Sequence, residues 1–243
     1  MLSEINKHER DKYISFKEEG HIYNVNGNTD YTSVTKIVKN LFEQFNPDKV
    51  IDNMMKSPKW TQNKYFGMEK WEIKKQWKES GIKAAREGTQ MHLNIENYYN
   101  GVEENIDNIE YKYFNNFVKD NDNLIPYRSE WTVFDIDKKI TGTIDMVFIN
   151  EDNTLSIYDW KRSKDIVKTT NFNKYSKLKS IDHIPDTNYW HYSIQLNIYK
   201  YVIEKNYGFK VRDLYLVQIH PENNNYKKLK VPFLEEEIKN IIL

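Results

Sequence analysis

The chain has 243 residues, of which 36 are Lys or Arg and 36 are Asp or Glu, so its formal net charge is zero. This balance excludes a strong global field, and a nucleic-acid ligand would need a local basic surface. The absence of cysteine excludes disulfides, thiolate–zinc sites and a cysteine nucleophile. No apolar run could span a membrane or serve as a signal peptide, so we expect a soluble intracellular protein, in the cytoplasm or, for a viral protein, in the host cytoplasm.

Residues 1–79 are predicted to form a hairpin followed by helices, after an N-terminal segment that is either a loose arm or an irregular helix. Residues 21–25 alternate between polar and apolar types, and the Asn26-Gly27 dipeptide that follows favours a two-residue hairpin turn and a return strand. Apolar residues recur at helical spacing over residues 34–42, after a capping Thr or Ser. Pro47 fits the first turn of a second helix, which should run to about residue 55. A helical pattern over residues 67–78 predicts a third.

Residues 80–243 are predicted to form an α/β core with a mixed β-sheet flanked by helices. Helical spacing predicts the longest helix at residues 80–100. The order after it is one helix, a three-strand meander, another helix, two strands and a short helix. Their expected ranges are 109–118, 127–134, 140–149, 155–161, 188–205, 211–220, 226–231 and 234–242.

Two of the predicted strands each carry a carboxylate between apolar neighbours: Asp145 in residues 140–149 and Asp159 in residues 155–161. Burying an isolated carboxylate costs several kcal/mol unless a cation or hydrogen-bond donors compensate. Because side chains alternate along a strand, Asp159 and Lys161 should share one face. Two acids and a lysine at the ends of paired strands therefore predict a site that binds a divalent metal and activates water for hydrolysis.

Further candidate residues lie on neighbouring elements. His92 and Glu96 are four residues apart and should project from one face of the long predicted helix. Glu130 lies in the strand that precedes the Asp145 strand. Glu96 and Glu130 could support the metal ligands or hold a second metal ion, or they could be surface or structural acids.

Four short motifs occur in a fixed order: Gly88-x-x-x-His92, Gly142-x-x-Asp145, Asp159-x-Lys161 and Gln195-x-x-x-Tyr199. Asp-x-Lys alone is a weak signal, but the ordered set resembles the RecB-like branch of the PD-(D/E)XK nuclease superfamily. The segments at residues 31–35 and 88–92 are also similar to those of mitochondrial genome maintenance exonuclease-like proteins and of related nucleases of phages and large DNA viruses.

The resemblance implies a restriction-endonuclease-like PD-(D/E)XK core and a set of residue roles. It implies that Mg²⁺ or Mn²⁺ is held by His92, Asp145, Asp159 and the backbone carbonyl of Trp160. Lys161 would orient the attacking water and offset charge that develops on the phosphate oxygens. Gln195 and Tyr199 would lie beside this cluster and position the substrate or the lysine.

The function that the resemblance implies is a metal-dependent DNA exonuclease, acting at single-stranded ends or flaps in DNA replication, recombination or repair. The alternatives are a structure-specific endonuclease and a catalytically inactive DNA-binding scaffold of the same fold. Lysines in residues 67–78 and 164–179 are candidates for contact with the DNA backbone, and the Trp and Tyr residues near residues 67–78 are candidate stacking platforms. The lysines of residues 67–78 could equally form a solvated helix face.

Overall fold

The computed structural model describes residues 1–103, 105–170 and 174–242. The chain forms two compact units: unit 1 comprises Met1–Glu43 with Met91–Leu243, and unit 2 comprises Gln44–Gln90. Within the described ranges, none of the helices combines the length and apolar character that a membrane span requires. The division of the chain into functional domains at residues 1–79 and 80–243 stays a prediction.

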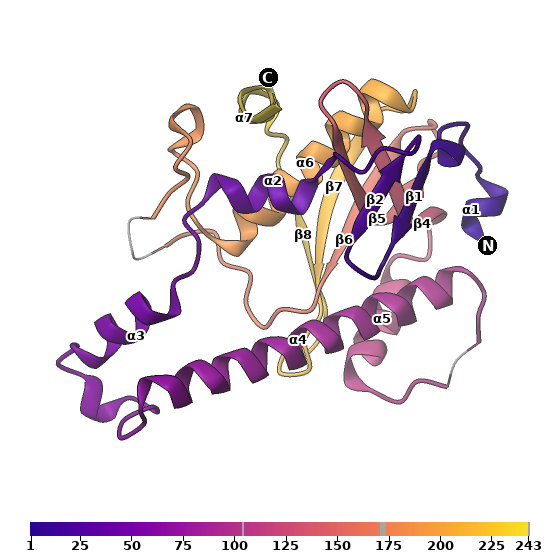
Figure 1. Cartoon of the computed structure of the whole chain (residues 1–243). Helices are drawn as coiled ribbons and strands as arrows, with labels where there is room; N and C mark the ends of the chain where they lie inside the picture. Colours follow the sequence, from indigo (N-terminus) through magenta and orange to yellow (C-terminus); the bar gives the residue numbers. More distant parts are fainter. Residues whose placement is uncertain (104, 171–173, 243) are drawn as a thin grey trace. The chain divides into compact units, whose positions relative to one another are not determined.

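Unit 1 is built on a six-stranded mixed sheet, in which β5 is the central strand of the predicted meander (Figure 1). One edge of β5 pairs with the antiparallel strand β4. The other edge pairs with the parallel strand β3 at the start of β5 and with the antiparallel strand β6 at its end. Beyond β6 come β7, parallel to it, and β8, antiparallel to β7. The strands are β3 (Thr32–Ser33), β4 (Ile125–Asp135), β5 (Ile140–Ile149), β6 (Leu155–Lys161), β7 (Val211–Gln218) and β8 (Lys227–Lys230).

β5 and β6 pair over only part of their lengths. Their register ends at Met146 opposite Tyr158, whereas β6 continues to pair with β7 as far as Lys161. On the β5 side, β3 pairs only with Ile140 and Thr141. Residues 142–145 of β5 and the last three residues of β6 therefore face each other outside the ladder.

Helices cover both faces of this sheet. The first face is covered by α2 (Val34–Leu41) and α6 (Asn188–Asn206), and the other by α5 (Ile109–Asp120) and the part of α4 (Lys70–Tyr99) that belongs to unit 1. The short α7 (Glu235–Ile242) packs against α6. The mixed sheet between two helical layers agrees with the α/β core that the sequence predicts.

The apolar clusters follow the alternation of the strands. Ile157 of β6 lies in the cluster shared with α2 and α6. Its neighbours Tyr158 and Trp160 lie in the opposite cluster, where Phe114 and Phe117 of α5 contact the Trp160 ring edge to face. Tyr158 and Trp160 therefore share a face, as the alternation of side chains along a strand requires.

The N-terminal hairpin has a different partner from the predicted one. β1 (Ile14–Lys17) pairs antiparallel with β2 (Ile22–Val25), so the strand that pairs with β2 precedes it. The Asn26-Gly27 turn does form, with positive φ at both residues, but it is followed only by an isolated bridge from Val25 to Asn28. The expected return strand at residues 30–31 is wrong: after the bridge at Asn28 the chain leaves β2, and its next strand, β3, pairs with β5.

The arm before the hairpin is held on the sheet and is not loose. It contains α1 (Leu2–Ile5), and the Asp11 carboxylate accepts hydrogen bonds from Arg128 Nη1 at 2.7 Å and Trp131 Nε1 at 3.0 Å. Arg128, on β4, is only 5% exposed. Burial alone would raise the pKa of Asp11, but the hydrogen bonds, above all from Arg128, outweigh it and lower the pKa. The arm therefore contributes a charge that the buried guanidinium requires.

Unit 2 consists of α3 (Pro47–Met55) and the beginning of α4. The Asn46 side chain caps α3 by accepting a hydrogen bond from Lys49 N at 3.1 Å. The two helices predicted at residues 67–78 and 80–100 are a single helix, α4. Gly81 does not end it, because a glycine inside a helix costs about 1 kcal/mol and removes no backbone hydrogen bond.

Candidate active site

Asp145 lies where the ladder between β5 and β6 ends. Its Oδ2 accepts a hydrogen bond from the backbone N–H of Trp160 at 2.9 Å. A side-chain oxygen thus takes the place of a backbone carbonyl, which ties the end of β6 to β5 and holds the strands apart. Burial raises the pKa of Asp145, although the positive charges of His92 and Lys161 act to lower it.

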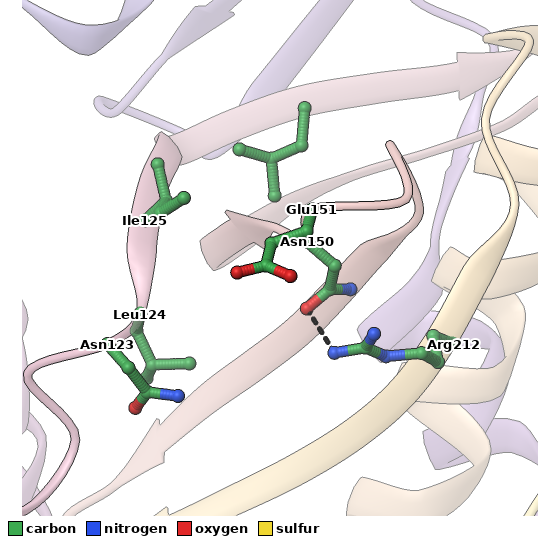
Figure 2. Close-up of a pocket in the computed structure, with 7 residues that line it drawn as sticks. Asn123, Leu124, Ile125, Asn150, Glu151 and Arg212 are labelled. Carbon is green, nitrogen blue, oxygen red and sulfur yellow. Dashed lines mark hydrogen bonds between the residues drawn. The ribbon is translucent and has the colours of Figure 1, made fainter.

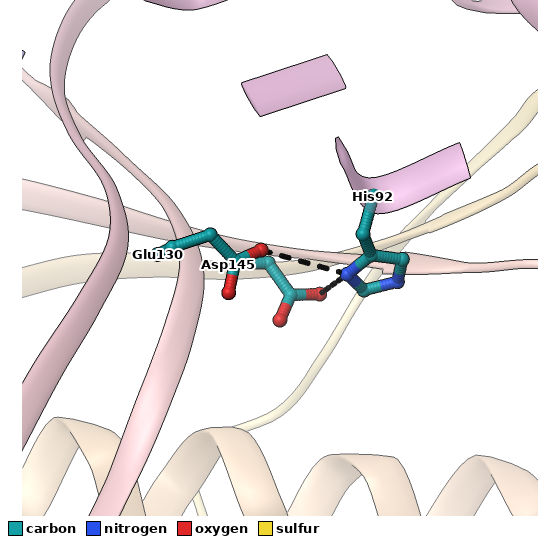
Figure 3. Close-up of side chains that lie close together, drawn as sticks. All are labelled: His92, Glu130 and Asp145. Carbon is teal, nitrogen blue, oxygen red and sulfur yellow. Dashed lines mark ion pairs between the residues drawn. The ribbon is translucent and has the colours of Figure 1, made fainter. Parts of the chain in front are cut away.

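His92 and Glu130 complete a group of three side chains around Asp145 (Figure 3). Nδ1 of His92 lies 3.7 Å from Asp145 Oδ2 and 3.7 Å from Glu130 Oε1. Burial alone would lower the pKa of His92, but the two carboxylates outweigh it and raise the pKa to about 9. Without a metal ion, a protonated imidazole therefore supplies the positive charge between the two acids.

The other ring nitrogen of His92 has a different partner. Nε2 lies 2.9 Å from the carbonyl oxygen of Trp160, and because a carbonyl only accepts, the ring must donate. Histidines that bind metals usually donate their second N–H to such an acceptor, which orients the ring. The predicted metal ligand Trp160 O thus contacts the His92 ring, and Nδ1 is the nitrogen that faces the carboxylates.

Glu130 reaches this group through an unusual backbone conformation. Its φ is +42°, in the left-handed region, which costs a residue other than glycine about 1–3 kcal/mol. Its neighbours Ser129 and Trp131 pair with Met146 and Ile144, so Glu130 lies at the level of Asp145. The sequence leaves Glu130 open between a metal-site role and a structural one; the structure places its carboxylate in the group.

Asp159 and Lys161 form an adjoining group with Gln195. Asp159 is 2% exposed; its Oδ1 accepts a hydrogen bond from Gln195 Nε2 at 3.2 Å, and its Oδ2 lies 2.7 Å from Lys161 Nζ. Among the residues that the structure describes, none donates a well-aligned hydrogen bond to this Oδ2. Burial raises the pKa of Asp159 to about 7 despite the nearby ammonium group.

Lys161 is held between the two acids. Burial would lower its pKa, but the charges of Asp159 and Asp145 outweigh burial and raise it, so the ammonium group stays protonated at neutral pH. The charge of Asp145 also contributes to raising the pKa of Asp159. Both acids and the lysine therefore lie close enough for each charge to act on the others.

The sequence misses one neighbour of Lys161. Tyr192 has its ring centroid 4.8 Å from Lys161 Nζ, within the range of a cation–π contact. It precedes Gln195 by three residues on α6, and residues at this spacing lie on one face of a helix. That spacing is the signal from which Tyr192 could have been found.

Tyr199 is buried against Gly142 of β5 and does not face solvent. It is 3% exposed, and a Cβ at Gly142 would lie 2.8 Å from its Cε1 and 2.9 Å from its hydroxyl oxygen. The glycine of the Gly142-x-x-Asp145 motif is therefore required by the close approach of Tyr199. Glu96, one turn from His92, is outside the group of three, and burial raises its pKa.

We expect Gly142→Ala to lower the free energy of unfolding by about 1–3 kcal/mol, because the added methyl group overpacks a site closed by a buried ring. Urea unfolding followed by tyrosine and tryptophan fluorescence would measure this. The matched control is Gly81→Ala in α4, where an added Cβ meets nothing within 4 Å. It should leave stability unchanged or raise it by up to about 1 kcal/mol; equal effects at both glycines would contradict the packing argument.

The group of three fits a divalent cation. Ligands bound at about 2.1 Å to one octahedral ion lie about 3.0 Å apart when adjacent and about 4.2 Å apart when opposite. The two separations of 3.7 Å from His92 Nδ1 fall in this range. Carboxylates with one imidazole suit Mg²⁺ or Mn²⁺. The Asp159 carboxylate, whose Oδ2 lies 2.7 Å from Lys161 Nζ, is a further potential ligand.

A separate pocket of about 290 Å³ lies where β5 ends and the next turn begins (Figure 2). Arg212 Nη2 donates a hydrogen bond there to Asn150 Oδ1 at 2.6 Å. None of the residues that line this pocket belongs to the candidate site, and Glu151 is its one acid. It offers no cluster of metal ligands.

Two of the candidate DNA-contacting lysines of residues 164–179 already contact other side chains of the protein. Lys164 forms an ion pair with Glu222 at 2.5 Å, and Lys168 Nζ lies 4.5 Å from the centroid of the Tyr189 ring. Residues 171–173 lie outside the described residues. Contact between these lysines and DNA stays a prediction.

Comparison with known proteins identifies the family. A protein-family model of the PD-(D/E)XK nuclease superfamily matches residues 68–240. The solved structure of the protein SSO0001 is 15% identical, with a TM-score of 0.37, over 88% of this chain and 74% of that chain. A candidate exonuclease from Eubacterium rectale is 13% identical, with a TM-score of 0.31, over 60% of this chain and 68% of its own.

Both structural likenesses are too weak to carry an argument, and no curated protein gives a significant match. The family match covers well over half of the chain, and its members share the mixed α/β architecture found here. The fold class predicted from the sequence is thereby confirmed. The chain belongs to the PD-(D/E)XK nuclease superfamily.

Proposed function

We propose that this protein is a metal-dependent DNA exonuclease that hydrolyses phosphodiester bonds at single-stranded ends or flaps, in replication, recombination or repair. The observation that carries the proposal is the convergence of His92, Glu130 and Asp145 beside the buried pair of Asp159 and Lys161. Family membership supports nucleic-acid hydrolysis. The preference for single-stranded ends rests on the resemblance of the motifs.

His92 Nδ1, Asp145 and Glu130 would hold the cation, with Asp159 adding an oxygen ligand. A bound divalent cation would polarise the scissile phosphate and lower the pKa of a water molecule. The imidazole in the ligand set favours Mn²⁺ over Mg²⁺. In this proposal Glu130 joins the ligands, and the Trp160 carbonyl orients the His92 ring by accepting its second N–H in place of binding the cation.

Lys161 would act on the attacking water and the phosphate. Its ammonium group keeps its proton, so it can donate to the water oxygen and offset the charge that grows on the phosphoryl oxygens. Gln195 would position Asp159 through its hydrogen bond to Oδ1. Tyr192 would limit the movement of Lys161 by covering the ammonium group with its ring.

We expect Glu130→Gln to weaken Mn²⁺ binding at least about tenfold, because the change removes one charge from the group of three and keeps the shape of the side chain. Titration of Mn²⁺ alone, followed by the electron spin resonance of the free ion, would measure it. Glu96→Gln is the matched control, since it removes an acid one turn from His92 but outside the group. Equal weakening in both variants would mean that the group of three does not hold the ion.

The exonuclease proposal is tested with end-labelled linear and covalently closed single-stranded DNA in the presence of Mn²⁺. Linear DNA should be degraded from its ends and closed circles should stay intact. Cutting of circles would favour the structure-specific endonuclease. Binding without cleavage under all metal conditions would favour the inactive scaffold, and cleavage in excess EDTA would contradict metal dependence.

A further inference from the structure

Unit 2 contains a pocket whose lining combines aromatic rings with lysines. Its volume is about 620 Å³, within the range of about 300–1,000 Å³ that small-molecule sites occupy. It lies wholly within residues 44–90, and none of its lining residues belongs to the candidate active site. The side chains that the argument uses are Phe45, Trp71, Trp77, Lys74, Lys75 and Lys78.

The spacing along α4 brings the rings and the charges together. Trp71, Lys74, Lys75 and Lys78 follow the i, i+3, i+4, i+7 pattern, which places them on one face of the helix. Trp71 is 63% exposed, and Phe45, which precedes α3, is 68% exposed. Both rings line the pocket and both are exposed to solvent. They indicate a binding surface, because exposed aromatic area is otherwise unfavourable.

One wall of the pocket is held in place before any ligand arrives. Trp77 Nε1 donates a hydrogen bond to the Tyr65 hydroxyl at 2.8 Å, and the Tyr65 ring packs against the Trp77 ring at 6.0 Å. The Phe45 ring lies 5.8 Å from the Trp77 ring, at an interplanar angle of 49°. A wall that is already rigid lowers the side-chain entropy that the protein must lose when a planar group binds.

The lysines differ in how far their charge is already compensated. Lys74 Nζ lies 2.9 Å from Asp48 Oδ1 and is paired. Lys75 and Lys78 are exposed, and neither has an ion pair with another of the described side chains. Two uncompensated positive charges at the rim of an aromatic pocket favour an anionic ligand that also has a flat apolar face.

We propose that this pocket binds single-stranded DNA, with an unpaired base stacked on Trp71 and Phe45 and the flanking phosphates at Lys75 and Lys78. A single strand combines a π-face with one negative charge per nucleotide, which is the combination that the lining matches. The bases of a duplex are stacked on each other and cannot enter. The inference rests on the proposed function only in taking DNA as the polymer.

The experiment measures binding without cleavage. The full-length protein is titrated in EDTA into a short fluorescein-labelled oligo(dT), and fluorescence anisotropy gives Kd at several salt concentrations. Trp71→Ala should raise Kd about tenfold, because it removes a stacking partner. Lys75→Ala combined with Lys78→Ala should make the slope of log Kd against log salt shallower by about 1.4, from about 0.7 for each phosphate contact.

Matched controls come from the same unit. Phe66→Ala removes another exposed ring of unit 2 that does not line the pocket. Lys49→Ala combined with Lys59→Ala removes two exposed lysines outside the pocket. Both controls should bind oligo(dT) within twofold of the parent protein and with its salt slope. An oligomer with abasic sites should bind the parent protein at least as weakly as oligo(dT) binds the Trp71→Ala variant, because it loses stacking on both Trp71 and Phe45.

The inference is overturned if Trp71→Ala binds oligo(dT) within twofold of the parent protein. It is also overturned if the salt slope of the double lysine variant is unchanged, or if duplex DNA loses as much affinity as oligo(dT) in Trp71→Ala. Failure of the nuclease proposal is separately visible, since binding would then depend on Trp71 while Mn²⁺ still produced no cleavage. If the protein cleaves DNA and Trp71→Ala leaves the KM of cleavage unchanged, the result would count against the pocket proposal alone.

Discussion

Lys161→Met should lower kcat for DNA hydrolysis by about 10²–10³, the usual effect of removing one preorganised charge from an active site. The ammonium group is buried, lies 2.7 Å from Asp159 Oδ2 and stays protonated, and a methionine carries no charge to take its place. Methionine keeps much of the apolar stem of lysine. Asp159 already has a raised pKa and can take up a proton when its partner is lost, so we expect the fold to survive.

Single-turnover cleavage of end-labelled single-stranded DNA with Mn²⁺ measures the effect, and circular dichroism checks the fold. Lys239→Met is the matched control, because Lys239 is exposed and pairs with Glu236 at the surface. It should cleave within about twofold of the parent rate, as expected for an exposed ion pair. Full turnover by Lys161→Met with an intact fold would remove Lys161 from the mechanism.

Asp11→Ala should lower the free energy of unfolding by about 3 kcal/mol, at the lower end of the range for breaking a buried ion pair. The substitution leaves the Arg128 guanidinium buried without its carboxylate and the Trp131 indole N–H without its acceptor. Partial exposure of Asp11 keeps the loss from being larger. Urea unfolding at neutral pH measures the difference. Asp30→Ala, which breaks an exposed pair with Lys139, should change stability little.

The same pair predicts a pH dependence. The pKa of Asp11 is lowered in the folded state from its ordinary value of 3.8. The folded state therefore binds this proton less readily than the unfolded state, and the stabilisation is fully present above pH 3.8. It is lost as the pH falls through the lower pKa of the folded state. The stability difference between the parent protein and Asp11→Ala should shrink over that acid range; a difference that stays constant would contradict the ion-pair argument.

The strands that carry the acids could be predicted from the sequence with accuracy. The ranges 140–149 and 155–161 coincide with β5 and β6, because polar turn residues bound both apolar runs and the connection is short. The placement of Asp159 and Lys161 together follows from strand alternation alone. Likewise, Ser33 caps α2 by accepting a hydrogen bond from Lys36 N, as local capping rules predict.

Other features could not be read from local patterns. After the bridge at Asn28 the chain leaves β2 and pairs next with β5, and no local signal records that long-range pairing. The helix α4 continues across Gly81 although a glycine inside a helix costs about 1 kcal/mol, because the rest of the helix outweighs that cost. Glu130 resembles any acid in a strand until its left-handed backbone brings it opposite Asp145.

The sequence by itself determined the order of the helices and strands from α5 onward, the two acid-bearing strands and the family motifs, because these depend on residue type and on spacing along the chain. Only the tertiary structure decided which groups meet: His92 Nδ1 with Asp145 and Glu130, the Trp160 carbonyl with the His92 ring, and Tyr199 with Gly142. These contacts join residues far apart in the chain. They follow from where the β5–β6 ladder ends and how the helices pack on it, which local propensity does not encode.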